Sequence, residues 1–526
     1  MASIQKIAIL GFGREGRAVL RFLQNRGLAE IETLVSADKK NKNKKIRENS
    51  RKNQRLSASA EIWVLDKNPT IKIPGGLKKQ IGKNYLKNLE QFNIVFRSPG
   101  IPYNLPEIQN AKKHGATISS GTKLFFKAIS GQILNSHAYR QAGKFQISKI
   151  IGVTGTKGKG TTCTLLYKIL KAHSTDSGQA GGRRVFLAGN IGKPAMEILS
   201  KTRINADREN PRGSAPVVIL ELSSFQLQDL NMSPQIAAVL DIFPDHQDSH
   251  ANLTEYYNAK ANIARYQSAG DKIFYFPDNP KSAWIAGKSR GKKIGVVPEK
   301  FKLFSPEDLK MPGYHNFKNA VMAANIACSL GVPEKIILRV VKKFHGTEHR
   351  LELVRTLKIA NQSRKVFANI RELNSRKIRE IQFYNDSSST NPHTVAAAVR
   401  AFSSSTKKLQ PTSYKLILIA GGKDKNLDYS PLAKALKNSP TKLVVLIGEN
   451  RKKIATALAR TKNNELRIKM VKNLQTALSL AYAATKKYLI HNSKFIILFS
   501  PGAASFDMFH DYADRGRQFK ELVNRL

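Results

Sequence analysis

Residues 150–162 read IIGVTGTKGKGTT, an apolar run followed at once by a glycine-rich turn. The apolar run predicts a buried strand, and residues 164–172 behind the turn predict a helix. Glycines in such a turn let backbone N–H groups close around a phosphate at the helix N-terminus, and Lys159 is placed to reach the terminal phosphates. The stretch therefore predicts an ATP-binding loop.

The same pattern of apolar run, turn and helical segment recurs along the chain. Further apolar runs lie at residues 7–10, 217–220, 415–420, 443–447 and 495–499. Strands that alternate with helices predict an α/β fold with parallel sheets, in which ligands bind beyond the carboxyl ends of the strands. At roughly 100–200 residues per domain, a chain of 526 residues is expected to form about three domains.

The charge balance is strongly basic. The chain carries 88 Lys and Arg against 38 Asp and Glu, a formal net charge of +50, yet its 41% of hydrophobic residues predicts a globular protein. Much of the excess lies in polar stretches such as residues 38–55, whose lack of aromatic side chains argues against stacking on single-stranded nucleic acid. Solvated surface charge is the favoured interpretation, and a nucleic-acid partner stays open as a secondary one.

The sequence contains no clear pattern for a membrane segment, a disulfide framework or a zinc site. No apolar run approaches the roughly 20 residues that span a bilayer, and the run at 7–10 is too short for a signal peptide. Two cysteines, Cys163 and Cys328, exclude a disulfide framework, and no Cys/His cluster has zinc spacing. We therefore expect a cytoplasmic protein, and a monomer, because nothing in the pattern demands an interface.

Acidic side chains follow two of the predicted strands. Glu221 comes directly after its apolar run, and a second run at 237–242 leads to Asp245, His246 and Asp248. A carboxylate at the end of a strand can hold Mg²⁺ on a nucleotide, and a histidine between two carboxylates could serve a second ion. Taken alone, the second segment fits a polar turn with a hydrogen-bonded histidine equally well.

Near the N-terminus, Gly11, Gly13 and Gly16 form a G-x-G-x-x-G fingerprint between a predicted strand and a predicted helix. Taken alone, such a turn indicates a site for NAD or FAD. Another diphosphate ligand needs the same turn and helix N-terminus. Asp66, directly after the apolar run at 62–65, could meet the base or ribose of such a ligand.

Together these segments resemble the Mur ligase family, most closely its D-glutamate-adding branch, from about Lys6 to Leu526. The motifs that carry the resemblance are, in chain order, SPGI at 98–101, GTKGKGTT at 155–162, GNIG at 189–192, ELSSFQL at 221–227, DHQD at 245–248, GYHNFKN at 313–319, HRLE at 349–352, NDS at 385–387, GGKDK at 421–425 and SPGAASFD at 500–507. Several motifs in one order are far more specific than any single motif.

The resemblance implies an ATP-dependent ligase of peptidoglycan synthesis. Its reaction would join D-glutamate to UDP-N-acetylmuramoyl-L-alanine through an acyl phosphate, with ATP and Mg²⁺ as cofactors and small molecules as partners. It also implies three α/β domains: a Rossmann-like UDP-binding domain at 1–128, a central P-loop ATPase domain at 129–348 and a Rossmann-like, amino-acid-binding domain at 349–526.

The resemblance further implies roles for individual residues. The residues expected to be catalytic are Lys159, His246, Lys260 and Asp386. Those expected to bind ATP are Gly155, Thr156, Lys157, Gly158, Lys159, Gly160, Thr161, Asn316, Asn319 and Arg350. Those expected to bind the UDP substrate are Gly11, Gly13, Gly16, Asp66, Ser98, Gly100 and Asn190. Those expected to bind D-glutamate are Thr390, Lys425, Ser505 and Tyr512.

The metal ligands implied in the same way are Thr161, Glu221, His246 and, if it is carbamylated, Lys260. Carbamylation would turn the Lys260 ammonium into a carboxylate-like anion. The alternative is an unmodified surface lysine on a helix.

The chain departs from the family pattern at several of these positions. Gly160 replaces a hydroxyl residue expected at the metal, Ser388 replaces a lysine, Lys157 replaces an asparagine, and Lys123 lies where an acidic residue is common. These departures predict an active site that has diverged from the family pattern. The alternatives are another amino-acid ligase of the same superfamily, or a weakened relative that binds nucleotide or nucleic acid.

Overall fold

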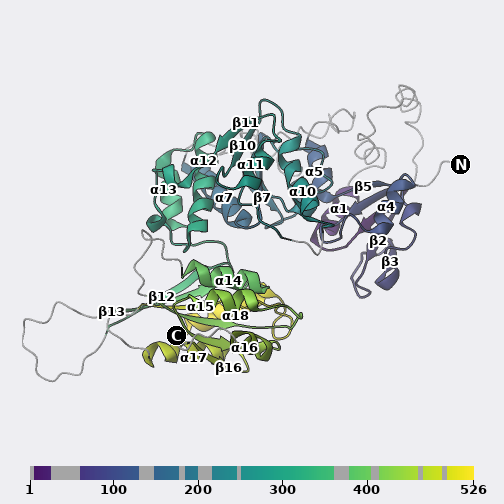
Figure 1. Ribbon diagram of the computed structural model, residues 1–526. Coiled ribbons are helices and arrows are strands. Elements are labelled where there is room, and N and C mark those ends of the chain that lie inside the picture. The colour runs from purple at the N-terminus through teal and green to yellow at the C-terminus, as the bar shows by residue number, and fades with distance from the viewer. Residues whose placement is uncertain are drawn as a thin grey trace, which may run out of the picture. The chain divides into compact units, whose positions relative to one another are not determined.

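The computed structural model describes residues 5–24, 60–129, 147–176, 184–199, 216–245, 250–360, 378–403, 414–459, 466–487 and 494–526. The chain forms two compact units, Met1–Lys300 with Asn319–Ile337 and Phe301–Lys318 with Leu338–Leu526. The described residues form three sheets, which confirms the predicted α/β fold (Figure 1). The polar stretch at 38–55 and the predicted site residues His246 and Asp248 lie outside the described residues.

The N-terminal sheet is parallel, with strand order β3-β2-β1-β4-β5. Its strands are β1 Gln5–Leu10, β2 Ala60–Asp66, β3 Lys78–Ile81, β4 Ile94–Arg97 and β5 Thr117–Ser119. The helices of this part are α1 Arg14–Gln24, α4 Pro106–Lys113 and α5 Gly121–Ile129, with short 3₁₀ helices η1 Gly82–Asn84 and η2 Leu89–Gln91. Strand β1 lies in the middle because its apolar residues from Ile7 to Leu10 are covered on both faces.

The central sheet is also parallel, with strand order β11-β10-β9-β6-β8-β7. Its strands are β6 Lys149–Thr154, β7 Val185–Gly189, β8 Val217–Glu221, β9 Ile236–Val239, β10 Lys272–Tyr275 and β11 Lys292–Gly295. The helices are α7 Lys159–Asp176, α9 Ser224–Leu227, α10 Leu253–Arg265, α11 Pro280–Ala286, α12 Tyr314–Ser329 and α13 Glu334–Lys343. The glycine-rich turn follows β6 between β9 and β8, so the ends of three strands meet around it.

One predicted strand is shorter than expected. The run at 237–242 forms β9 only as far as Val239. Beyond that point the Leu240 N–H donates to the Thr154 carbonyl, and the Thr156 N–H donates to the Asp241 carbonyl, both at 2.9 Å. The chain therefore leaves the sheet to line the glycine-rich turn, which an apolar run alone does not reveal.

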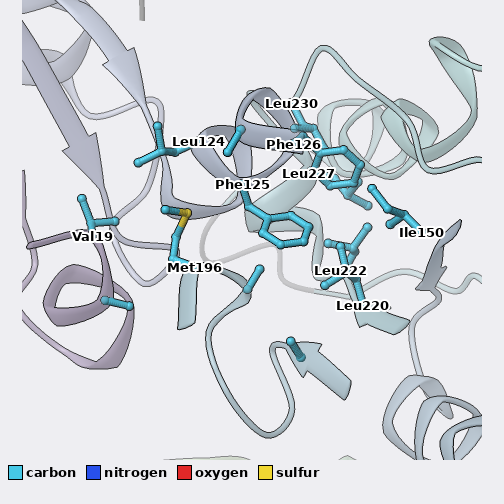
Figure 2. Packing of buried hydrophobic residues seen from close by; sticks show 14 of the residues in the cluster. Val19, Leu124, Phe125, Phe126, Ile150, Met196, Leu220, Leu222, Leu227 and Leu230 are labelled. Carbon is cyan, nitrogen blue, oxygen red and sulfur yellow. The ribbon is translucent and has the colours of Figure 1, made fainter. Parts of the chain in front are cut away.

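The two sheets of the first unit share one hydrophobic core. Helix α5 supplies Phe125 and Phe126, which lie between Val19 of α1 and the central-sheet residues Ile150 and Leu220 (Figure 2). A buried ion pair also joins the two sheets of this unit.

That ion pair links the end of β4 to the segment after α9. The Arg97 guanidinium donates to the Phe225 carbonyl at 2.9 Å and approaches the Asp229 carboxylate at 3.4 Å. Both charged side chains are almost fully buried. The first unit is therefore held together by apolar packing and by a desolvated charge pair.

The C-terminal sheet has strand order β12-β13-β17-β14-β15-β16, in which only the β12–β13 pair is antiparallel. Its strands are β12 Glu352–Ala360, β13 Ile378–Asn385, β14 Tyr414–Ala420, β15 Thr441–Leu446, β16 Arg467–Met470 and β17 Lys494–Phe499. Its helices are α14 Pro392–Ala401, α15 Ser430–Lys437, α16 Arg451–Ala459, α17 Leu474–Lys487 and α18 Tyr512–Asn524. Separate apolar clusters pack on its two faces, so helices cover the sheet on both sides.

Among the described helices, none combines the length and apolar character that a membrane span requires. The expected domain limits at residues 128 and 348 stay a prediction.

Candidate active site

The glycine-rich turn connects β6 to the N-terminus of α7. Gly158 has φ +83°, and a Cβ there would collide with Oδ1 of Asn319 on α12. The Lys159 ammonium folds back onto its own loop, donating to the carbonyls of Gly155 at 2.9 Å and Thr156 at 3.1 Å. The turn is therefore a tight backbone cradle that holds its lysine close to the space in which a phosphate would bind.

The hydroxyl residues after Lys159 lie inside the first turn of α7. Thr161 is buried, and Gly160 before it supplies no side chain. The buried Oγ1 of Thr162 has no hydrogen-bond partner among the described residues. Thr161 is thus the nearest hydroxyl that follows the loop lysine.

Lys260 lies on α10 and is only 2% exposed. Its Nζ donates to the Gly155 carbonyl at 3.0 Å and lies 4.8 Å from the centre of the Tyr256 ring. Burial, and then the neighbouring Lys159 charge, hold the pKa of Lys260 well below its usual range. The alternative of an ordinary surface lysine is therefore wrong, and a neutral amine is the form that can take up CO₂.

Tyr256 is a site residue that the sequence did not single out. Its hydroxyl lies 3.0 Å from Oγ1 of Thr156, whose Oγ1 also accepts the Phe243 N–H at 2.8 Å. Burial raises the pKa of Tyr256 above its usual value, so the phenol stays protonated. Tyr256 therefore connects α10 to the phosphate loop one helical turn before Lys260.

Glu221 ends β8 beside the phosphate loop and is buried. Its Oε1 accepts the Asn190 side-chain amide at 3.0 Å, and the Asn190 N–H donates to the Glu221 carbonyl at the same distance. Gly189, with φ +99°, lets the two backbones approach, because a Cβ there would collide with Glu221. Asn190, expected at the UDP substrate, is thus placed directly against the expected metal ligand.

The N-terminal glycine turn is held by the residues expected to touch the UDP moiety. Asp66 accepts the Phe12 N–H at 2.6 Å, and the Ser98 hydroxyl donates to the Gly11 carbonyl at 2.7 Å. A Cβ on Gly16 would collide with that same carbonyl, whereas Gly13 and Gly100 have open space where a Cβ would lie. In the described structure Asp66 and Ser98 therefore shape the turn.

Glu15, inside the same turn, is a further residue that sequence reasoning missed. Burial raises its pKa to about 7. One carboxylate oxygen accepts a weak 3.4 Å hydrogen bond from Gln226, and the other is buried without a partner among the described residues. Gln226 forms the capping box of α9 with Ser223, so Glu15 connects the N-terminal glycine turn to the helix that follows β8.

In the second unit, Asp386 lies at the end of β13 and is 5% exposed. Its carboxylate accepts the Ser500 hydroxyl at 2.7 Å and the Leu351 N–H at 3.2 Å. Burial raises its pKa to about 7, an effect opposed by those hydrogen bonds and by Arg350. In the described structure the Asp386 carboxylate is therefore held by the Ser500 hydroxyl and the Leu351 N–H.

The residues expected to bind D-glutamate surround the ends of β13, β14 and β17. Thr390 and Lys425 are exposed, Ser505 is buried, and Tyr512 is 49% exposed with its ring edge-on to His349. Lys423, a second cation of the GGKDK motif, is engaged elsewhere, because its Nζ lies 2.9 Å from the Glu449 carboxylate. A cation and hydroxyls are thus available at these strand ends.

Arg515 is the third residue that the sequence did not reveal. Its fully buried guanidinium donates to the carbonyls of Ser387 at 2.8 Å, Ala503 at 3.0 Å and Ala504 at 3.2 Å. It therefore ties the loop that leads to Thr390 to the loop that carries Ser505. No local motif announces this role, because its partners lie up to 128 positions away.

Two groups of predicted residues emerge. In the first unit, the phosphate loop, Lys260, Glu221, Asn190 and Asn319 lie together. In the second unit, Arg350, Asp386, Ser505 and Tyr512 belong to segments joined by hydrogen bonds and ring contacts. Asn316 is on α12 with Asn319 and donates to the Pro312 carbonyl at 2.7 Å.

A cavity of about 820 Å³ in the second unit is lined by other residues, some of them next to Asn316 in the sequence. Aromatic side chains line part of it: Tyr314, Phe317, Tyr384, Phe402 and Tyr414. None of the described residues assigned above to ATP, metal or D-glutamate lines it, so we place the active site elsewhere.

Comparison with known proteins defines the class. The model of the Mur ligase middle domain matches residues 153–303, and that of the Mur ligase glutamate ligase domain matches residues 372–491. The chain belongs to the Mur ligase family, whose members are ATP-dependent, ADP-forming amide ligases, and it is an enzyme of that class.

The similar proteins carry a more particular name. UDP-N-acetylmuramoylalanine--D-glutamate ligase of Acetivibrio thermocellus is 32% identical over 503 residues, covering 89% of this chain and 92% of that protein. The protein of the same name from Symbiobacterium thermophilum is 30% identical and covers 99% of this chain and 98% of its own. A solved structure of MurF from Acinetobacter baumannii aligns over 88% of this chain and 86% of that chain, at 15% identity and a TM-score of 0.49.

Proposed function

We propose that this protein joins D-glutamate to UDP-N-acetylmuramoyl-L-alanine, with ATP converted to ADP and phosphate, in the synthesis of peptidoglycan precursors. The observation that carries the proposal is the 32% identity to a ligase of that name over 89% of the chain. The cluster of phosphate loop, Lys260 and Glu221 supports it, because it provides the parts that phosphoryl transfer needs. We propose that the reaction takes place in the cytoplasm, where ATP is supplied, and we expect the enzyme to act as a monomer.

The chemistry requires a better leaving group than a carboxylate offers. Transfer of the γ-phosphoryl group of ATP to the alanyl carboxylate breaks the bond to the ADP oxygen and forms an acyl phosphate. The amine of D-glutamate then attacks the acyl carbon, phosphate leaves, and the amine loses a proton. Negative charge develops on the phosphoryl oxygens and on the tetrahedral intermediate, so the site needs cations and N–H donors more than it needs a nucleophile.

The phosphate loop supplies such groups. Backbone N–H groups around Gly158 and at the start of α7 would bind the phosphates, and Lys159 would exchange its loop carbonyls for phosphate oxygens. Lys157, exposed on the same loop, would add a further cation to the phosphate site. Arg350 is a further residue that we propose for nucleotide binding.

The oxygen donors near the loop fit Mg²⁺. Glu221 offers a carboxylate and Thr161 a hydroxyl, both hard oxygen ligands of the kind this ion prefers. Bound there, Mg²⁺ would neutralise phosphate charge. Lys260, once carbamylated, would add a carboxylate-like ligand, and the low pKa of its buried amine favours that modification. His246 would complete the set.

The two organic substrates would be recognised by separate loops. The UDP diphosphate would bind at the N-terminal glycine turn, which Asp66 and Ser98 shape. The two carboxylates of D-glutamate would be met by Lys425, Thr390 and Ser505, with Tyr512 beside them. We keep residues 1–128, 129–348 and 349–526 as the proposed domains for these tasks.

The deciding experiment is phosphate release from ATP and Mg²⁺ by the purified protein with UDP-N-acetylmuramoyl-L-alanine. D-glutamate is compared with L-glutamate, D-aspartate, lysine and diaminopimelate, and K159M serves as the control for the phosphate loop. Release that requires both the UDP substrate and D-glutamate is expected. Release with another amino acid would assign a different ligase, and no release despite ATP binding would leave a binding role.

A further inference from the structure

Arg350 lies at the apex of a strained turn between α13 and β12. The residues on either side of it have positive φ, +65° for His349 and +43° for Leu351. The other two non-glycine residues with positive φ in the described part of the chain are asparagines, which tolerate this region, whereas leucine does not. Such a conformation persists only where the surroundings hold it.

Two carboxylates hold the backbone of this turn. Glu352 Oε2 accepts the His349 N–H at 2.8 Å, and Asp386 Oδ1 accepts the Leu351 N–H at 3.2 Å. The His349 carbonyl in turn accepts the Ser388 N–H at 2.9 Å. The peptide groups on both sides of Arg350 are therefore fixed to neighbouring loops.

The same backbone conformation determines which side chains of the turn are buried and which one is exposed. His349 and Leu351 are each 7% exposed, whereas Arg350 is exposed. A Cβ on Gly516 of α18 would collide with the His349 ring, and Leu351 joins the apolar core of the C-terminal sheet. With both neighbours anchored inward, the guanidinium of Arg350 is directed to solvent.

Glu352 is itself oriented by two donors. Its Oε1 accepts the Lys520 ammonium at 3.0 Å, and its Oε2 accepts the Asn385 side-chain amide at 3.2 Å. The carboxylate is mostly buried, with its side chain 16% exposed. A charged acceptor that is fixed in this way makes a stronger hydrogen bond to a backbone N–H than a mobile one does.

We propose that Glu352 is a positioning residue for ATP binding: together with Asp386 it stabilises the strained turn that presents Arg350 to the nucleotide. The inference rests on the proposed function in one respect, the role of Arg350 at ATP. Removal of the Glu352 carboxylate leaves the buried His349 N–H without its acceptor, so the turn relaxes and Arg350 loses its orientation.

The test is a double-mutant cycle on ATP affinity, measured by titration calorimetry with a non-hydrolysable ATP analogue and Mg²⁺ on the full chain. R350A and E352A are each expected to weaken binding about tenfold, and R350A/E352A no more than R350A alone, because the two residues act as one unit. E352Q, which keeps an acceptor oxygen, is expected to stay within about threefold of the unaltered protein.

K520M is the matched control for charge, because it removes the ion pair of Glu352 while the Asn385 amide still orients the carboxylate and the bond to His349 stays in place. It should bind the analogue within about twofold of the unaltered protein. If E352A does not fold, E352D replaces it, since a shorter side chain withdraws the carboxylate from the His349 N–H. Unchanged affinity in R350A or in E352A, or full additivity in the double variant, would overturn the proposal. Because this readout needs no D-glutamate and no UDP substrate, a negative ligase assay leaves it intact.

Discussion

At the scale of single residues, burial changes what a side chain can do. Lys260 is an ammonium by type, yet it is buried beside Lys159, and its Nζ contacts the Gly155 carbonyl and the Tyr256 ring. Desolvation favours its neutral form, which is nucleophilic toward CO₂. Carbamylation would therefore replace a poorly solvated cation at this position by an anion that could ligate a metal ion.

This gives the first prediction. K260M should lower kcat about 100-fold or more, the scale of losing a preorganised charged group in an active site. The unaltered enzyme should lose activity in CO₂-depleted buffer and regain it when bicarbonate is added, as measured by phosphate release. The activity of K260M should not change when bicarbonate is added. If the unaltered enzyme is fully active without CO₂, that result contradicts carbamylation, irrespective of the activity of K260M.

The second prediction concerns Asp386, whose pKa is raised from 3.8 to about 7. Between about pH 4 and pH 7 the folded protein keeps a proton that the unfolded chain has lost, so stability is full below this window and falls as pH rises through it. The D386N variant has no carboxyl group at this position and therefore binds no such proton. Relative to the unaltered protein it should therefore gain about 1–3 kcal/mol of unfolding free energy between pH 5 and pH 8.

Urea unfolding of both proteins at pH 5 and pH 8 measures that gain. Glu15, whose pKa is also about 7, titrates in both proteins and cancels in the difference. Equal changes in the two proteins would show that Asp386 does not titrate in this range.

At the scale of elements, the strands could be predicted because parallel strands buried on both faces are continuous apolar runs. β1, β6, β8, β14, β15 and β17 all lie at the predicted runs within one or two residues at either end. β9 was predicted too long, because the bonds of Leu240 and Thr156 that end it depend on the neighbouring loop. The sequence shows which residues of a strand are apolar, but it does not show where hydrogen bonds to a neighbouring loop end the strand.

The phosphate loop allows a third prediction. G158A should weaken ATP binding and lower stability by about 1–3 kcal/mol, because alanine is strained at φ +83° and its Cβ would meet Asn319. G75A is the matched control, a loop glycine with no atom within 4 Å of the added Cβ. Thermal unfolding and nucleotide titration compare the two. Equal behaviour of G158A and G75A would mean that the loop adapts without cost.

At the scale of the whole molecule, the candidate site could be predicted as a set of motifs but not as a set of contacts. The motifs located the phosphate loop, Glu221 and Lys260. Arg515, Glu15 and Tyr256 escaped, since each acts through partners that are remote in sequence and belongs to no local pattern of charge or spacing. Residues that hold a site together need the fold before they can be recognised.

The last prediction concerns the integrity of the first unit. R97M leaves the Asp229 carboxylate buried without its cation, which should lower the stability of this unit by about 3–5 kcal/mol. R97M/D229L removes both charges and should recover most of that loss. The two tryptophans of the chain, Trp63 and Trp284, both lie in the first unit, so tryptophan fluorescence follows its unfolding selectively.

Chemical unfolding followed by fluorescence should therefore show an earlier transition for R97M and a transition close to that of the unaltered protein for the double variant. Circular dichroism, which also reports on the second unit, should show a smaller shift than fluorescence does. Equal shifts by both probes would mean that the two units unfold as one cooperative block. No shift in R97M would mean that the Phe125–Phe126 core alone holds the two sheets of the first unit together, and the ion pair would then contribute specificity of packing without net stability.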